Sequence, residues 1–241
     1  MKLTLKITSL LLSYPTQQLM DEMPELVAAL DQSKLAKTHK DRLASLGQNI
    51  AELDLYDAQE RYVHLFDRTR SLSLHLFEHV HGESRDRGQA MVDLKEMYDA
   101  QGLEIEAKEL PDHLPVFLEF LSTQSDEDAR ELLGQTVHIL TFLRERLKKR
   151  NSVYAKAFQV LEALAAGKAE KGLLEELLSQ PDDDPDDLDA LDEVWEEEAV
   201  TFGGNAGENA CGPDRLQRQI RAAARKAPGV ESPTINNSRG M

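Results

Sequence analysis

Three histidines in one short segment are the residues of this sequence best suited to bind a metal. His75, Glu78 and His79 fit the pattern H-x-x-E-H, in which two histidines on one helix bind zinc and the glutamate acts as a base. A zinc hydrolase also needs a third protein ligand and an open position for water, and no other motif marks either one. The alternative is that His79 and His81 form local hydrogen bonds near a helix end. In that case, His75→Leu should be neutral or mildly stabilising.

The charged residues around and after these histidines have two further interpretations. They lie beside the apolar Phe77, and an apolar floor with a charged rim is typical of a peptide-binding surface. The same side chains could instead form a salt-bridge network that ties two helices together. Both interpretations stay open at this stage. The residues concerned are Glu78, His79, Glu83, Arg85, Asp86 and Arg87.

A second unusual segment holds Asp112 and His113 between Pro111 and Pro115. We expect Asp112 to cap the helix that carries Phe117, and His113 to lie in the first turn of that helix. An Asp-His pair resembles part of a hydrolytic relay. However, the sequence has no glycine-framed serine and no glycine motif for phosphate or dinucleotide binding. The sequence therefore gives poor support to catalysis.

The apolar residues before position 180 recur almost everywhere with the period of a helix. A stripe from Leu133 to Leu147 predicts one helix, for which Ser125 is the N-cap, and Gly102 and Gly167 are placed to end two others. No convincing alternation of apolar and polar residues predicts a strand. We expect an all-α protein, with one helical bundle domain over residues 1–180 and roughly eight to ten helices.

The composition changes at residue 181. Eleven acidic residues and no basic one occur between 182 and 198, and the whole of 181–241 carries 14 acidic and 6 basic residues. We divide this part into an acidic segment, 181–202, and a tail, 203–241, expected to be disordered. Leu188, Leu191, Val194 and Trp195 keep helical spacing, so 186–200 is either a short docking helix or part of a solvated acidic tail.

The overall charge and the cysteine count exclude several classes of function. The chain has 28 Lys and Arg against 44 Asp and Glu, a net charge of −16, which disfavours nucleic acid and anionic membranes and favours a basic partner. One cysteine, Cys211, excludes an internal disulfide and a cysteine-ligated zinc or iron–sulfur site. We expect a reduced, cytoplasmic protein without bound cofactor. No apolar run is long enough for stable membrane insertion.

In the segment around His75–Arg87 and in the segment around Asp112, the sequence closely resembles the NarJ/NarW family, the assembly chaperones of the membrane-bound respiratory nitrate reductase. Residues 76–94 carry the resemblance most specifically. Further similar stretches are 12–15, 65–68, 109–121 and 190–198. The resemblance runs from about the first helix to about residue 202, and the tail beyond it has no match.

The resemblance implies the all-helical fold of chaperones for twin-arginine-exported molybdoenzymes, and no enzymatic activity. The expected partner is the N-terminal segment of the nitrate reductase catalytic subunit, held competent for molybdenum cofactor insertion and assembly, with the cofactor biosynthesis machinery as a further partner. A basic, amphipathic segment suits an apolar groove with an acidic rim. The candidate peptide-binding residues are Tyr62, Phe66, Phe77, Glu78, His79, Glu83, Arg85, Asp86, Arg87, Asp112, His113 and Phe117.

Overall fold

The computed structural model describes residues 1–81, 85–105, 109–184 and 186–187, and within these ranges it contains no β-strand. The all-α prediction is therefore confirmed. The α-helices are α1 (Lys2–Leu11), α2 (Gln17–Ala29), α3 (Lys37–Ala51), α4 (Leu55–Phe66), α5 (Glu78–His81), α6 (Arg85–Ala100), α7 (Leu114–Thr123), α8 (Asp126–Gln135), α9 (Val137–Lys149), α10 (Ala155–Leu164) and α11 (Lys171–Ser179). Two 3-10 helices, η1 (Leu30–Gln32) and η2 (Arg70–Leu72), complete the elements.

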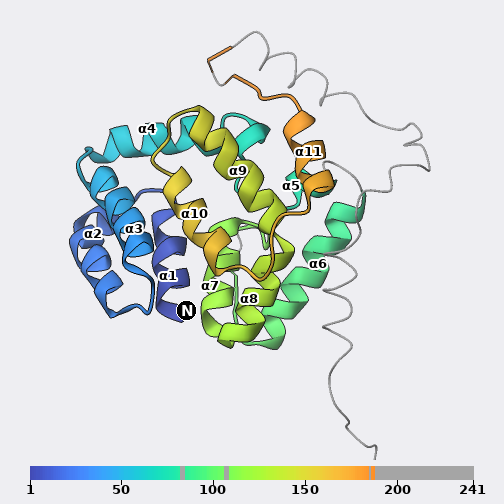
Figure 1. Ribbon diagram of the computed structural model, residues 1–241, viewed down its shortest axis with the longest axis horizontal. Coiled ribbons are helices and arrows are strands. Elements are labelled where there is room, and N and C mark those ends of the chain that lie inside the picture. Colours follow the sequence, from blue (N-terminus) through green and yellow to red (C-terminus); the bar gives the residue numbers. More distant parts are fainter. Residues whose placement is uncertain (82–84, 106–108, 185, 188–241) are drawn as a thin grey trace, which may run out of the picture.

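The helices pack around one apolar core, through pairs of sequence neighbours such as α2 with α3 and α9 with α10 and through pairs distant in sequence. Helix α1 packs against α7, and α10 joins the two halves by contacting α3 on one side and α9 on the other (Figure 1). Leu5, Leu43, Leu118, Leu143 and Phe158 lie in this core and are essentially inaccessible to solvent. The long-range pairing of α1 with α7 holds the start of α7, at Leu114, in the core.

Several helix ends follow the capping residues that the sequence contains. The Ser125 hydroxyl accepts a hydrogen bond from the backbone N–H of Asp128, as predicted for the N-cap of α8. Gly102 and Gly167 follow α6 and α10 with φ values of +75° and +86°, a conformation that glycine adopts without a Cβ penalty.

The prediction of one helix along the Leu133–Leu147 stripe is wrong. The chain breaks at Thr136, which ends α8 and precedes α9, and the Thr136 hydroxyl donates to the Leu133 carbonyl. A Cβ on Gly134 would lie 2.4 Å from the Ala166 carbonyl oxygen, so the glycine permits this close approach. Such breaks give eleven α-helices in the described ranges, more than the eight to ten expected.

The acidic segment begins on the body of the protein. Arg146 donates to the Gln180 carbonyl at 2.8 Å, while Lys149 and Arg150 reach the two carboxylate oxygens of Asp182 at 3.1 and 3.0 Å. We call these three cations, at the C-terminal end of α9, the α9 clamp. Basic side chains at this end of a helix also complement its dipole. The predicted docking helix over 186–200 and the tail 203–241 lie outside the described residues, apart from 186–187.

Candidate functional site

The two segments that the sequence singles out cross at the centre of the molecule. His75 and His113 form an isolated antiparallel bridge, in which Leu76 N–H donates to the Asp112 carbonyl at 3.0 Å and Leu114 N–H donates to the Leu74 carbonyl at 2.9 Å. The two imidazole rings lie 5.1 Å apart, centroid to centroid. The chain before α5 and the chain before α7 therefore hold each other in place.

Asp112 is fully buried at this crossing and does not cap α7 as predicted. One carboxylate oxygen lies 3.2 Å from His75 Nδ1, and the other accepts the Phe77 backbone N–H at 3.0 Å. The N-cap of α7 is His113, whose side chain makes no capping hydrogen bond. A buried carboxylate needs charged or hydrogen-bonding partners, and the crossing chain supplies both. For the same reason Asp112 is not part of an accessible rim.

The two histidines of the crossing differ in protonation. Burial lowers the pKa of His75, but the hydrogen bond and charge of Asp112, together with Glu78, outweigh burial and raise it overall. Burial, followed by repulsion from His75, lowers the pKa of His113 to about 4. His113 Nδ1 lies 3.2 Å from a Glu109 carboxylate oxygen without hydrogen-bond geometry. The site therefore combines a protonatable His75 with a His113 that is neutral at physiological pH.

The structure contradicts the zinc interpretation of His75, Glu78 and His79. His75 lies in the bridge before α5 begins at Glu78, so the two histidines do not share the one helix that the motif requires. His75 faces Asp112, while His79 Nε2 donates to the Ser73 carbonyl at 2.8 Å. No group of three metal-ligating side chains occurs in the part of the chain described here. The local hydrogen bonding expected of His79 is confirmed.

The charged residues on either side of His79 form at least one contact between helices. Arg87 of α6 donates to the Glu78 carboxylate of α5 at 3.0 Å, and both side chains are about three-quarters buried. This pair confirms the salt-bridge interpretation for these two residues. Asp86 is exposed at the start of α6. Glu83 and the side chain of Arg85 lie outside the described residues.

The four aromatic residues among the candidate peptide-binding residues belong to the hydrophobic core. Their exposed fractions are 3% or less, and Tyr62, Phe66 and Tyr154 form a chain of edge-to-face ring contacts. A peptide cannot reach these rings while the core is closed. His79 is buried as well, at 7% exposure, whereas His113 is partly exposed. The residues at the 3% limit or below are Tyr62, Phe66, Phe77 and Phe117.

Other residues that shape this centre gave no signal in the sequence. The buried Tyr98 hydroxyl donates to the Pro111 carbonyl at 2.8 Å and so ties α6 to the crossing. Arg146 stacks over the Phe142 ring, 4.3 Å from its centroid, and donates to the Ser71 carbonyl at 3.1 Å. Tyr98 and Arg146 both fit a helical pattern in the sequence, but that pattern does not predict these long-range contacts.

The fold is an all-helical bundle around one apolar core, in which a histidine–carboxylate crossing joins the chain before α5 to the chain before α7. Residues 18–159 match the family described as nitrate reductase delta subunit. The chain is 42% identical over 228 residues to the nitrate reductase molybdenum cofactor assembly chaperone NarJ of Escherichia coli (strain K12), covering 93% of this chain and 94% of that protein. It is 39% identical over 198 residues to the probable nitrate reductase molybdenum cofactor assembly chaperone NarW of the same strain, covering 82% and 83%.

A crystal structure of a putative redox enzyme maturation protein from Archaeoglobus fulgidus is similar, with 23% identity, a TM-score of 0.49 and coverage of 68% of this chain and 92% of that one. The chain belongs to the nitrate reductase delta subunit family, and the resemblance to the NarJ/NarW proteins is confirmed. Each helix in the described ranges is too short or too polar to cross a bilayer.

Proposed function

We propose that this protein is an assembly chaperone for a respiratory nitrate reductase and has no catalytic activity of its own. The observation that carries the proposal is the 42% identity, over nearly the full length of both chains, to a protein named as a molybdenum cofactor assembly chaperone of nitrate reductase. The hydrogen bonds of His75 to Asp112 and of His79 to the Ser73 carbonyl fit a structural role for these two histidines rather than zinc binding. The chaperone works in the cytoplasm, before the mature enzyme functions.

The client segment is the N-terminal part of the catalytic subunit of nitrate reductase. A basic, amphipathic segment is complementary to a chain with a net charge of −16. Charge accelerates the encounter, and apolar contacts hold the complex. The chaperone keeps this segment engaged while molybdenum cofactor is inserted, and the cofactor biosynthesis machinery is a further partner at that stage.

The accessible part of the predicted peptide-binding set lies along the start of α6 and the segment before α7. Asp86 is exposed and His113 is partly exposed. Val92 on α6 and Leu110 before α7 add exposed apolar surface, at 49% and 44% of their areas. Asp112 acts from within the protein, because its contacts with His75 and with the Phe77 N–H fix the position of the chain before α7.

A pulldown from cells that produce the catalytic subunit tests this function. The full chain should capture a catalytic subunit that has its N-terminal segment and should fail to capture one that lacks it. Cells without the chaperone should accumulate catalytic subunit with little molybdenum, measured by metal analysis of the purified enzyme. Equal capture of both forms of the subunit would contradict recognition of the N-terminal segment. Full molybdenum content without the chaperone would contradict the assembly role.

A further inference from the structure

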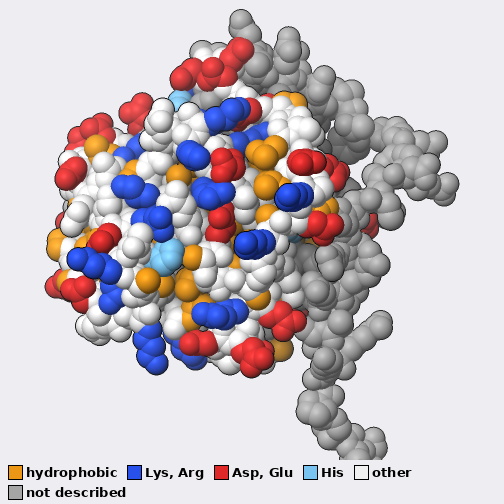
Figure 2. Space-filling view, in the orientation of Figure 1, with side chains coloured by type: hydrophobic (Ala, Val, Ile, Leu, Met, Phe, Trp, Pro, Cys, Tyr) orange, Lys and Arg blue, Asp and Glu red, His pale blue; other side chains and the backbone are white. Residues whose placement is uncertain are grey.

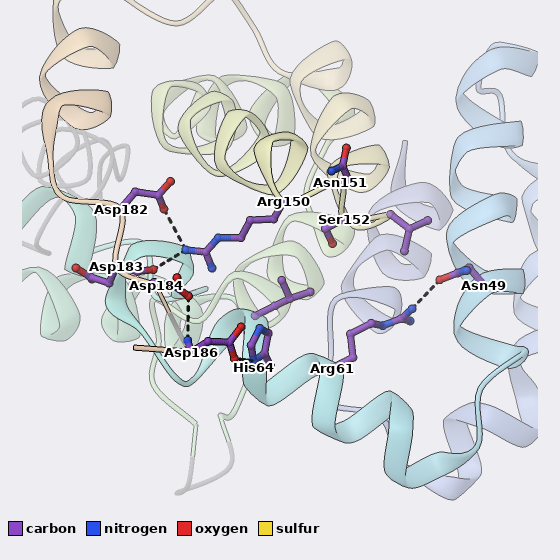
Figure 3. A pocket seen from close by; sticks show the side chains of 12 residues that line it. Asn49, Arg61, His64, Arg150, Asn151, Ser152, Asp182, Asp183, Asp184 and Asp186 are labelled. Atoms are coloured by element: carbon purple, nitrogen blue, oxygen red, sulfur yellow. Dashed lines mark hydrogen bonds and ion pairs between the residues drawn. The ribbon is translucent and has the colours of Figure 1, made fainter. Parts of the chain in front are cut away.

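A cavity of about 680 Å³ opens between α3, α4, the chain after α9 and the start of the acidic segment (Figure 3). It lies apart from the His75–Asp112 crossing, and none of the predicted peptide-binding residues lines it. Leu65 and Val153 give it an apolar floor. The polar residues that line it are Asn49, Arg61, His64, Arg150, Asn151, Ser152, Asp182, Asp183, Asp184 and Asp186.

Arg61, which projects from α4 into one side of the cavity, has an unused hydrogen-bonding edge. Its Nη1 donates to the Asn49 side-chain oxygen at 2.7 Å, which fixes the guanidinium. Its Nε and Nη2 are buried and have no hydrogen-bond partner among the described residues. These two nitrogens form one edge of the guanidinium, the fork that binds a carboxylate or phosphate through two parallel hydrogen bonds.

Neighbouring groups hold this fork in place without filling it. The Arg61 guanidinium carbon lies 5.4 Å from the centroid of the Tyr154 ring. Burial raises the pKa of the Tyr154 hydroxyl, and the charge of Arg61 together with hydrogen bonding to Arg61 opposes that rise. This contact is poorly aligned, since the hydroxyl and both fork nitrogens lack a partner with full hydrogen-bond geometry among the described residues. Leaving buried donors unpaired is costly, and their arrangement in one plane at a cavity favours an oxyanion as their partner.

The opposite wall of the cavity is acidic. Asp182 is already occupied by Lys149 and Arg150 of the α9 clamp, whereas the Asp184 carboxylate accepts the Asp186 backbone N–H at 3.0 Å. Figure 3 shows these aspartates and Arg150 on the side away from Arg61 and Asn49. A purely anionic ligand would meet repulsion at this wall. A ligand with an oxyanion at one end and a positive or N–H donor group at the other suits both walls.

We propose that this cavity binds a small molecule that carries both an oxyanion and an amino group. The Arg61 fork takes the oxyanion, a phosphate or a carboxylate. The Asp184 carboxylate takes the amino end, together with Asp186, which also lies 3.9 Å from His64 Nδ1. Asn151 and Ser152 supply further polar contacts along the wall between them. This assignment is independent of the chaperone function, because it rests on no residue of the proposed client surface.

The test is calorimetric titration of the full-length protein with O-phosphoethanolamine, β-alanine and ethyl phosphate. The first two carry both groups, with a phosphate or a carboxylate as the oxyanion, and ethyl phosphate lacks the amino group. At least one of the first two should bind, and ethyl phosphate should bind about ten-fold more weakly than O-phosphoethanolamine or not at all. Arg61→Lys keeps the charge but removes the fork, so it should weaken binding at least about ten-fold. Arg130→Gln, at an exposed position of α8 outside the cavity, should bind like the unaltered protein.

Two controls separate loss of the Arg61 contact from loss of folding and from a change in net charge. The thermal midpoint of each variant shows whether it is folded, and Asn49→Ala provides a second way to loosen the fork without changing the net charge. Binding that is equal in Arg61→Lys, Asn49→Ala and Arg130→Gln would overturn the assignment, because it would reflect general adsorption. No binding of either bifunctional ligand to the unaltered protein, or stronger binding of ethyl phosphate than of O-phosphoethanolamine, would also overturn it.

Discussion

His75 and His113 face each other at the centre of the molecule, yet they respond to pH in opposite directions. The folded-state pKa of His113 is about 4, below the ordinary value near 6.5. The unfolded chain therefore takes up more protons at this residue between pH 6.5 and pH 4, and stability falls as the pH falls through that window. The pKa of His75 is raised, so its contribution is complete below about pH 6.5 and is lost as the pH rises through the folded-state value.

The first prediction concerns His113. Its lowered pKa should cost the protein roughly 3 kcal/mol of unfolding free energy between pH 6.5 and pH 4. His113→Gln removes this titration, so the variant should lose correspondingly less stability over the same range. Urea unfolding at several pH values measures the difference. Identical pH profiles for the variant and the unaltered protein would mean that His113 titrates normally in the folded state.

The second prediction reverses the sequence-based expectation for His75→Leu. That expectation assumed an apolar helical position, but His75 lies in a bridge and is the charged partner of the buried Asp112. The substitution leaves Asp112 with only the Phe77 N–H and should destabilise the protein by roughly 2–4 kcal/mol. The loss should be larger at pH 6 than at pH 9, because the raised His75 pKa adds stability only at the lower pH. A neutral or stabilising effect would restore the original interpretation.

At the scale of elements, local helix signals in the sequence were largely sufficient, and the failures have a common cause. The Ser125 hydroxyl caps a backbone N–H three residues on, and Gly102 ends α6 through its own backbone conformation, so both signals act locally and both are confirmed. Asp112 also has the residue type and spacing of a cap, but a chain segment 35 residues away supplies a better partner in the Phe77 N–H. Next to the break at Thr136, Gly134 likewise lies close to Ala166, a distant residue that the periodicity of the sequence does not predict as a neighbour.

The third prediction compares two helical glycines to test the close packing at Gly134, beside the break. Gly134→Ala would place a Cβ 2.4 Å from the backbone oxygen of Ala166, so the packing of α8 against the chain after α10 must shift. We expect a loss of roughly 1–3 kcal/mol. Gly88→Ala in α6 meets nothing within 4 Å and should instead gain about 0.5–1 kcal/mol. Denaturant midpoints compare them directly, and similar effects at the two sites would contradict the crowding at Gly134.

The fourth prediction concerns the α9 clamp. The Arg146 side chain is 4% exposed, and it bonds the carbonyls of Ser71, Gln180 and Pro181. Arg146→Met should cost roughly 2–4 kcal/mol, because buried acceptors lose their donor. Lys149→Met, at a side chain that is 73% exposed, should change stability by about 0–1 kcal/mol. If both substitutions were equally mild, the clamp would not anchor the acidic segment to the body.

At the scale of the whole molecule, the excess of acidic residues is the feature that the sequence predicts best. The acidic excess follows directly from composition, and Figure 2 shows acidic and basic side chains intermingled over one face of the body. Composition does not predict which residues are buried. Phe77 and Phe117 have the character of peptide anchors, and only the three-dimensional packing of the helices reveals that they are core. The client surface must therefore be built from residues that this packing leaves outside.

The last prediction tests that surface through the kinetics of binding. A synthetic peptide of the client's N-terminal segment should bind more weakly as salt rises, because exposed charges are screened beyond about 10 Å at 0.1 M ionic strength. Asp86→Lys on α6 should slow association more than it speeds dissociation, since exposed charges act mainly on the encounter. Glu127→Lys, at an exposed position of α8, makes the same change in net charge and is the control.

The apolar part of the same interaction should survive high salt and appear as a negative heat-capacity change. Val92→Ala should raise the dissociation rate, because Val92 is exposed on α6 and is not required by the core. Phe117→Ala should instead lower the stability of the chaperone itself by roughly 3–5 kcal/mol. Binding that ignores salt and responds equally to Asp86→Lys and Glu127→Lys would exclude α6 as the acidic rim. The contact between Glu78 and Arg87 would then have only its structural role, in tying α5 to α6.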